Sequence, residues 1–202
     1  MKLARKLGRV LGALVFAAVF ALGVLGAKYQ PNITIPPGFA GRQVQIAGVP
    51  LRVVQRGAGR DILLIHGSPG CIEDWSPVMD ALASDFRVSA YDRPGHGYSG
   101  DTGTYSLEHN ARMASAVIAA LGLKHVIVAG HSYGGATTLA LALQAPPAVD
   151  GYVIVDSGAY TPPRKPDPIY ALLAPPWIGM GVATLIGQRL VPGRVRQGLL
   201  PM

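Results

Sequence analysis

Five consecutive residues in the middle of the chain have the types and spacing of a nucleophilic turn. Gly130-His131-Ser132-Tyr133-Gly134 follows an apolar run and opens a stretch of small residues. The pattern Gly-x-Ser-x-Gly between a strand and a helix is typical of a strained turn that raises a serine hydroxyl at the sheet edge. Small flanking residues allow strand and helix to approach closely. The pattern predicts Ser132 as a nucleophile, and the alternative is a tight glycine turn with an incidental serine.

Two earlier loops carry further glycine-rich signatures at the ends of predicted strands. They are His66-Gly67-Ser68-Pro69-Gly70 and the eight residues from Asp92 to Ser99. With the serine turn they occur in the order and approximate spacing of the α/β-hydrolase family, which residues 42–157 resemble. A serine at position 132 is unlike the dehalogenases and epoxide hydrolases of this fold, which use aspartate there.

The resemblance implies a set of roles for residues of these loops. The backbone N–H groups of Ser68 and Tyr133 would form an oxyanion hole, which stabilises the negative oxygen of a tetrahedral intermediate. His66 would organise its loop rather than act as the base. Asp92 and Arg93 would bond loop backbones. The chemistry would need no metal and no organic cofactor.

The catalytic acid and base are the weak part of the resemblance. The family's triad runs serine, then Asp or Glu, then histidine along the chain, whereas all five histidines here precede Ser132. Asp156, at the end of a predicted strand, is the candidate acid, with a loop-capping carboxylate as the alternative. We therefore expect a chain truncated before the late acid and histidine, and nearly inactive as it stands.

The N-terminus has the pattern of a membrane segment. Residues 10–27 carry no polar side chain, and four basic residues precede them. This predicts a membrane anchor in residues 1–28 with the domain on the non-cytosolic side. A cleaved signal peptide, and hence secretion, is the first alternative, and a buried core helix is the second. Residues 29–41, rich in Pro and Gly, read as a linker.

The body of the chain alternates between strand-like and helix-like segments. Two strands, Arg42–Ile46 and Leu51–Gln55, are predicted as a hairpin around the turn Gly48-Val49-Pro50. Further strands are predicted at Asp61–Ile65, Phe86–Tyr91, Val126–Ala129 and Tyr152–Val155. Helical spacing predicts helices at Trp75–Ala83, Ser106–Leu121 and Gly134–Gln144. Such alternation indicates an α/β class, a mostly parallel sheet with helices on both faces, over residues 42–160.

The C-terminal residues depart from this alternation. Residues 169–191 are apolar and interrupted by prolines and glycines. We expect residues 161–202 to begin a helical cap that shapes an apolar substrate pocket, with a second membrane span as the alternative.

Charge and cysteine content exclude some classes of function. The net charge is +7, but residues 29–159 hold eight basic and ten acidic residues, so the excess lies at the two ends. This distribution suits membrane headgroups better than nucleic acid. Cys71 is the single cysteine, which leaves no disulfide framework and no cysteine-based metal site.

These observations favour an ester-bond hydrolase or acyl-transfer enzyme that acts on a lipophilic small molecule through an acyl-Ser132 intermediate. Carbon–carbon bond hydrolysis, lactonase and cofactor-free peroxidase chemistry use a similar serine turn, and the motifs do not separate them. The rival is a non-catalytic, membrane-tethered binding module on the same fold, which the missing histidine favours. Oligomeric state is not predicted.

Overall fold

The computed structural model describes residues 2–28 and 33–158 of the chain. They belong to two units: helix α1 (Lys2–Lys28) lies in one, and an α/β body formed by residues 33–158 lies in the other. The predicted cap, residues 161–202, lies outside the described residues.

Helix α1 contains the whole apolar segment of residues 10–27. Its one described aromatic contact is a stacked pair, Phe16 and Phe20, with ring centroids 6.4 Å apart. No helix in the described ranges is long and apolar enough to cross a membrane, so the predicted transmembrane helix is not supported. The apolar run is at the lower limit of the roughly 20 residues that a bilayer requires.

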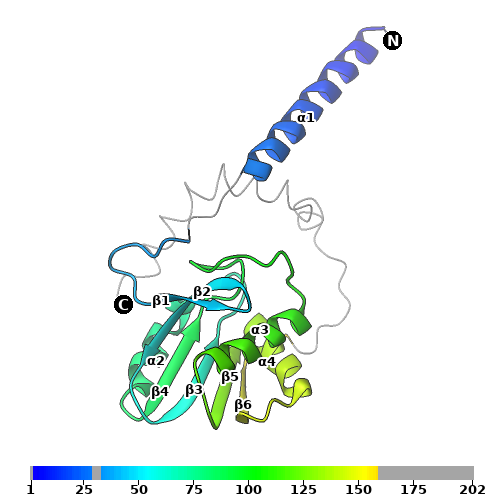
Figure 1. The fold of residues 1–202 in the computed structure, drawn as a ribbon. Coiled ribbons are helices and arrows are strands. Elements are labelled where there is room, and N and C mark those ends of the chain that lie inside the picture. The colour runs from blue at the N-terminus through cyan, green and yellow to red at the C-terminus, as the bar shows by residue number, and fades with distance from the viewer. Residues whose placement is uncertain (1, 29–32, 159–202) are drawn as a thin grey trace. The chain divides into compact units, whose positions relative to one another are not determined.

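The body is built on one six-stranded sheet. Its order is β1-β2-β4-β3-β5-β6 (Figure 1). Strand β2 is antiparallel to both of its neighbours, β1 and β4, whereas β3, β4, β5 and β6 are parallel to one another. The strands are β1 (Arg42–Ile46), β2 (Val49–Arg56), β3 (Arg60–Ile65), β4 (Phe86–Tyr91), β5 (Val126–His131) and β6 (Val149–Val155). The predicted mostly parallel α/β sheet is confirmed. The β1–β2 turn is Ala47-Gly48, one residue earlier than predicted, and both residues have positive φ, as a tight hairpin turn requires.

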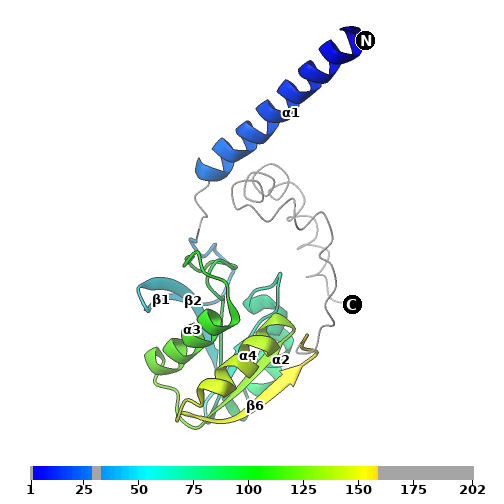
Figure 2. The same cartoon turned by 90° about the vertical axis from the view of Figure 1, so that its right-hand side faces the viewer.

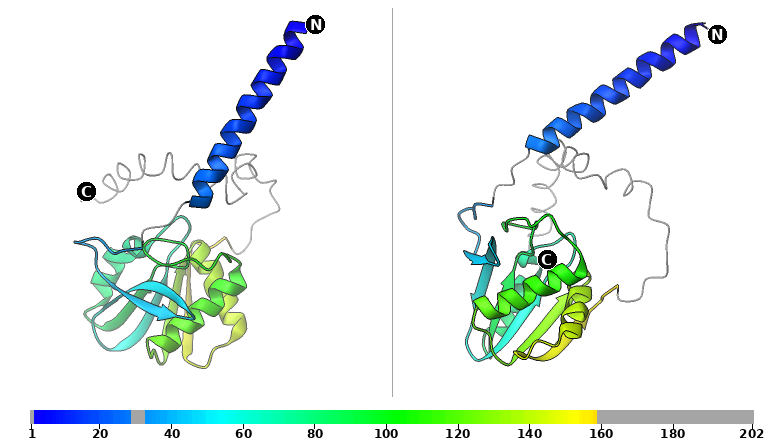
Figure 3. Two further views of the ribbon diagram at one scale, coloured as in Figure 1. Left: turned by 45° about the horizontal axis from the view of Figure 1, so that its top comes forward. Right: turned by 45° about the vertical axis from the view of Figure 1, so that its right-hand side comes forward.

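Helices cover both faces of this sheet. Helices α3 (Leu107–Ala120) and α4 (Tyr133–Gln144) lie on one face, and α2 (Ser76–Leu82) lies on the other (Figures 2 and 3). The segment predicted as one helix from Trp75 is a 3-10 turn, η1 (Ile72–Trp75), followed by the short α2. Pro77 fits the first turn of α2 because the backbone N–H that proline lacks would have no helical partner there.

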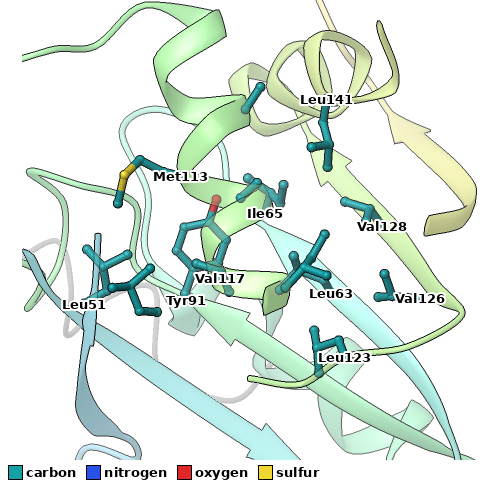
Figure 4. Close-up of a cluster of buried hydrophobic side chains, with 14 of the residues drawn as sticks. Leu51, Leu63, Ile65, Tyr91, Met113, Val117, Leu123, Val126, Val128 and Leu141 are labelled. Atoms are coloured by element: carbon teal, nitrogen blue, oxygen red, sulfur yellow. The ribbon is translucent and has the colours of Figure 1, made fainter. Parts of the chain in front are cut away.

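The core follows from the alternation of side chains along β3. Leu63 and Ile65 point to the α3 and α4 face, where they pack in a cluster with Leu141 (Figure 4). Ile62 and Leu64 point to the opposite face, in a cluster with residues of α2. Burial on both faces explains why this strand is a continuous apolar run rather than an alternating one.

The loops after the parallel strands meet at one edge of the sheet. Parallel strands end on the same side, so β3, β4, β5 and β6 place residues 66–70, 92–99, 132 and 156 along the same carboxyl edge. Ligand sites of open parallel sheets form at this edge. The fold therefore brings the three sequence signatures together.

Candidate active site

Ser132 occupies the sharp turn between β5 and α4. Its backbone has φ 53° and ψ −118°, a region that L-residues other than glycine rarely adopt. Its N–H donates to the carbonyl of Val155 (3.0 Å), and its own carbonyl accepts from Ala136 (3.1 Å). Both bonds hold the strained serine from neighbouring elements, so the predicted turn is present with the geometry that its pattern implies.

Glycines make the close approach around Ser132 possible. A Cβ atom on Gly130 would lie 2.2 Å from the carbonyl oxygen of Gly134. A Cβ atom on Gly134 would lie 2.1 Å from the carbonyl oxygen of Ile65, in β3. Backbone therefore packs directly on backbone on both sides of the turn, and the two flanking glycines of the motif have steric reasons to be glycine.

The loop after β3 lies against this turn. A Cβ atom on Gly67 would be 3.1 Å from the Cβ atom of Ser132. The peptide bond between Ser68 and Pro69 is cis. Within residues 33–158, the backbone N–H groups of Ser68 and Tyr133 have no recorded acceptor. The two predicted oxyanion donors thus belong to segments in contact at the nucleophile.

His66 is enclosed in this loop with both ring nitrogens engaged. The backbone N–H of Arg93 donates to Nε2 (2.9 Å), so Nδ1 carries the proton and donates to the carbonyl of Gly67 (2.8 Å). Burial, and then the positive charge of Arg93, lower the pKa of His66 to about 3. A neutral histidine without a free nitrogen cannot take the proton of Ser132.

The recorded contacts of the other histidines are with groups other than the Ser132 hydroxyl. His131 turns to the α2 face, where its ring meets Trp75 edge-on at 6.5 Å between centroids. The remaining three have partners of their own, namely Ser68, Pro94 and Arg93 for His96, Thr102 for His109 and Asp150 for His125. None of the five forms a hydrogen bond with Ser132 in the described part of the chain.

Asp156 lies one residue beyond β6, beside the turn. The carbonyl of the preceding residue, Val155, is the acceptor for the N–H of Ser132. Asp156 has φ 42° and is exposed, and its carboxylate has no hydrogen-bond partner among residues 33–158. It is close in the fold to the nucleophile, and its role as the triad acid stays a prediction.

A hollow of about 420 Å³ opens next to the turn, on the face of the sheet that α2 covers. Most of its lining surface is apolar, although three of the six lining residues are polar, two histidines and one carboxylate. The lining residues are His66, Asp74, Trp75, Val78, His131 and Val155.

A second polar cluster, of which the motifs identify only Asp92, lies behind the same loop. Arg52, fully buried on β2, donates to both carboxylate oxygens of Glu73 (2.5 and 3.0 Å) and to Asp92 (3.3 Å). The Asp92 carboxylate also accepts from the N–H groups of Ile72 (2.8 Å) and Tyr98 (2.9 Å). Asp92 belongs to the third loop signature, and these two backbone bonds agree with the role expected for it. The sequence signal for Arg52 is a charged residue inside an apolar strand. Its contacts tie the β2 strand to the segment that follows the Ser68 loop.

This cluster includes a set of side chains with metal-ligand spacing. One ligand atom each of Cys71, Glu73 and Asp92 lies within 4.8 Å of the others. The guanidinium of Arg52 already supplies the positive charge for both carboxylates. Burial, together with Glu73, raises the pKa of the Cys71 thiol to about 12, so it is not a thiolate at neutral pH. The donor set therefore fits an arginine better than a metal ion.

Comparisons with known proteins agree with this geometry. A non-heme haloperoxidase of Rhodococcus erythropolis is 43% identical over 81 residues, which is 39% of this chain and 30% of that protein. A 2-hydroxymuconate semialdehyde hydrolase of Pseudomonas sp. (strain CF600) is 34% identical over 128 residues, 61% of this chain and 45% of that protein. The solved structure of a membrane phospholipase A, a bacterial virulence factor, has a TM-score of 0.59 at 27% identity and covers 82% of this chain and 55% of that one.

The chain spans less than half the length of both curated relatives. A family model described as alpha/beta hydrolase fold matches residues 62–180, more than half of the chain. That segment contains all three loop signatures and the strained serine. The chain belongs to the α/β-hydrolase fold family.

Proposed function

We propose that the chain carries the nucleophile and the oxyanion hole of a serine hydrolase that acts on an ester-type bond. The observation that carries the proposal is the strained backbone of Ser132, held at the carboxyl edge of the sheet against the Ser68 loop. A serine in that conformation presents its hydroxyl to a substrate rather than to the protein.

The reaction follows from these positions. The Ser132 oxygen attacks the substrate carbonyl carbon, and the carbonyl oxygen takes up the negative charge between the N–H groups of Ser68 and Tyr133. The C–O bond to the alcohol then breaks and leaves an acyl-Ser132, which water hydrolyses. The hydroxyl proton must pass to a base, which returns it to the oxygen of the leaving alcohol. No histidine forms a hydrogen bond with Ser132 in residues 33–158, so the proposal requires a base from outside the described residues, with Asp156 as the candidate acid.

The substrate class in this proposal is a lipophilic small molecule. The hollow beside the turn is lined by Trp75, Val78 and Val155, which favour apolar surface. The phospholipase whose structure resembles this chain also acts on a lipid by its name. Hydrolysis rates that do not change with acyl-chain length would contradict this part of the proposal.

The nucleophile is tested by labelling with a fluorophosphonate, which forms a covalent bond with an activated serine. In a verified full-length protein that supplies the base, we expect one equivalent of label that Ser132→Ala abolishes. Ser84→Ala is the matched control, because Ser84 is exposed and bonds only to the Ala81 carbonyl and Asp85. Label that persists in Ser132→Ala would overturn the assignment.

A non-catalytic binding module is the second candidate, favoured by the absence of a histidine near the Ser132 hydroxyl. The two candidates differ in turnover. A p-nitrophenyl ester hydrolysed with multiple turnovers that depend on Ser132 indicates the enzyme. Absence of both labelling and turnover in a verified full-length protein indicates the binding module.

A further inference from the structure

Arg93 has an unusual position for a charged side chain. It is only 2% exposed and lies between the Ser68 loop and the first residue of α4. Its Nη2 donates to the carbonyl of Gly67 (2.8 Å) and its Nε to the carbonyl of His66 (3.1 Å). The guanidinium carbon lies 4.7 Å from the centroid of the Tyr133 ring. One side chain therefore contacts both segments that carry the predicted oxyanion donors.

The charge of Arg93 has no carboxylate partner in the described part of the chain. Its other side-chain partners are neutral, the amide oxygen of Asn110 (3.4 Å) and the ring of His96 (3.3 Å). Burying a cation without a counter-ion is costly. Burial accordingly lowers the pKa of Arg93. The adjacent carboxylate, Asp92, forms its ion pair with Arg52 instead. No carboxylate in residues 33–158 therefore offsets the positive charge of Arg93 beside the Ser68 loop.

The bond to Gly67 matters because of the peptide unit to which that carbonyl belongs. The oxygen of Gly67 and the N–H of Ser68 are the two ends of one peptide group. That oxygen accepts from both Arg93 and Nδ1 of His66, each at 2.8 Å. Donors at the oxygen end polarise the group and strengthen the N–H as a donor, more so when the donor is charged and buried.

We infer that Arg93 is a positioning residue of the oxyanion hole: it polarises the Gly67–Ser68 peptide and holds the Tyr133 side of the hole through its ring. The inference rests on the proposed function, because an oxyanion must form at Ser132 for the polarisation to act on catalysis. Arg93 itself does not touch the reacting atoms. Its effect reaches them through the N–H of Ser68.

The first test measures the peptide directly and does not depend on activity. The full chain is labelled with ¹³C and ¹⁵N, and the Gly67 carbonyl carbon and the Ser68 amide proton are followed by NMR. We expect Arg93→Met to move both signals upfield, and Arg93→Lys, which keeps the charge, to move them less. Arg52→Met is the matched control, since it removes another buried arginine that has no bond to Gly67. Equal shifts in both methionine variants, or none in Arg93→Met, would overturn the inference.

The second test measures the consequence for the nucleophile. Loss of a whole oxyanion donor slows catalysis by about 10²–10³, and a weakened donor should have a smaller effect. We expect Arg93→Lys to slow fluorophosphonate bonding to Ser132 about tenfold in kinact, with KI unchanged. Labelling at the wild-type rate would overturn the catalytic part of the inference. If the wild-type protein takes up no label but Arg93→Met still moves the NMR signals, the proposed function is rejected. The polarisation of the Gly67–Ser68 peptide by Arg93 would then still hold.

Discussion

Arg52 and Arg93 are the two largest fully buried side chains of the body, and only Arg52 has carboxylate partners among the described residues. Arg52 faces two carboxylates, Glu73 and Asp92, and its guanidinium lies near the rings of Phe39 and Tyr98, at 5.7 and 5.2 Å from their centroids. Arg93 faces carbonyls, an amide and an imidazole. A buried cation that is paired with carboxylates holds elements of the fold together. The electric field of an unpaired buried cation can instead act on nearby reacting groups.

The pKa shifts follow the same division. Burial alone would lower the pKa of Arg52, but Glu73 and Asp92 outweigh it and raise that pKa. Burial would raise the pKa of Glu73, and its bond to Arg52 lowers it instead. At Arg93, burial prevails and the pKa falls. The charges of Arg52 and Glu73 are therefore stabilised, whereas burial raises the pKa of Asp92 in the same cluster. At Arg93, beside the candidate active site, no carboxylate offsets the burial, and perturbed electrostatics of this kind tend to occur at functional sites.

The largest expected effect is the loss of the paired arginine. Arg52→Met would leave the carboxylates of Asp92 and, in part, Glu73 buried without a cation. Breaking a buried pair by removing one partner costs about 3–5 kcal/mol, so we expect a loss of that order in the free energy of unfolding, measured by urea denaturation. A loss under about 1 kcal/mol would mean that the ion pairs of Arg52 do not stabilise the fold in the way described.

The next effect tests the packing that holds Ser132. In Gly134→Ala the new Cβ would meet the carbonyl oxygens of Ile65 at 2.1 Å and His66 at 2.6 Å. Overpacking of this kind costs about 1–3 kcal/mol, and we expect that loss together with slower labelling of Ser132. Gly151→Ala in β6 is the control, because its Cβ would meet nothing within 4 Å. Equal unfolding midpoints for the two variants would contradict this account.

Acid should destabilise the Arg93 region before it breaks the Arg52–Glu73 ion pair. His66 has a folded pKa of about 3 against an ordinary value of 6.5, so the unfolded chain binds the extra proton between these values. The contribution of neutral His66 to the free energy of unfolding is full above pH 6.5. It is lost as the pH falls below that value, by about 1.4 kcal/mol per pH unit. The pKa of Glu73 lies below its ordinary value of 4.5, so the contribution of this carboxylate to the free energy of unfolding is lost only below pH 4.5.

This pH dependence is measured by urea denaturation at pH 7.5, 6.5 and 5. We expect His66→Gln, whose amide oxygen can still accept from the Arg93 N–H, to flatten the loss between pH 6.5 and 5. An unchanged slope in the variant would assign the acid sensitivity to another group.

The smallest effect separates the Tyr133 ring from its hydroxyl. The ring lies under the Arg93 guanidinium, and the hydroxyl donates to the carbonyl of Tyr105. Tyr133→Phe loses only the hydroxyl bond, about 1 kcal/mol. Tyr133→Leu also loses the cation–π contact and should cost about 0.5–2 kcal/mol more. The same unfolding free energy for both variants would show that the ring does not help to hold Arg93.

Local patterns were enough to predict most elements of the body. Strands β1 and β4 begin and end at the predicted residues. Helix α3 starts after Ser106, whose side chain accepts from the N–H of His109 (3.2 Å). Side-chain periodicity and cap or turn residues act within a few positions of the chain, so they can be read without the fold. The Ser132 turn belongs to this class, because its glycines and its strand–helix context are adjacent in sequence.

The partners of the two arginines, by contrast, were decided only by the tertiary structure. Arg52 reaches Glu73 over 21 positions and Asp92 over 40, and Arg93 reaches Gly67 over 26. These distances close only because β4 lies between β2 and β3 in the sheet, an order that no local pattern contains. The residue types are read from the sequence, whereas strand order and burial decide which of the two cations has a carboxylate partner, since electrostatic energy depends on neighbours in space.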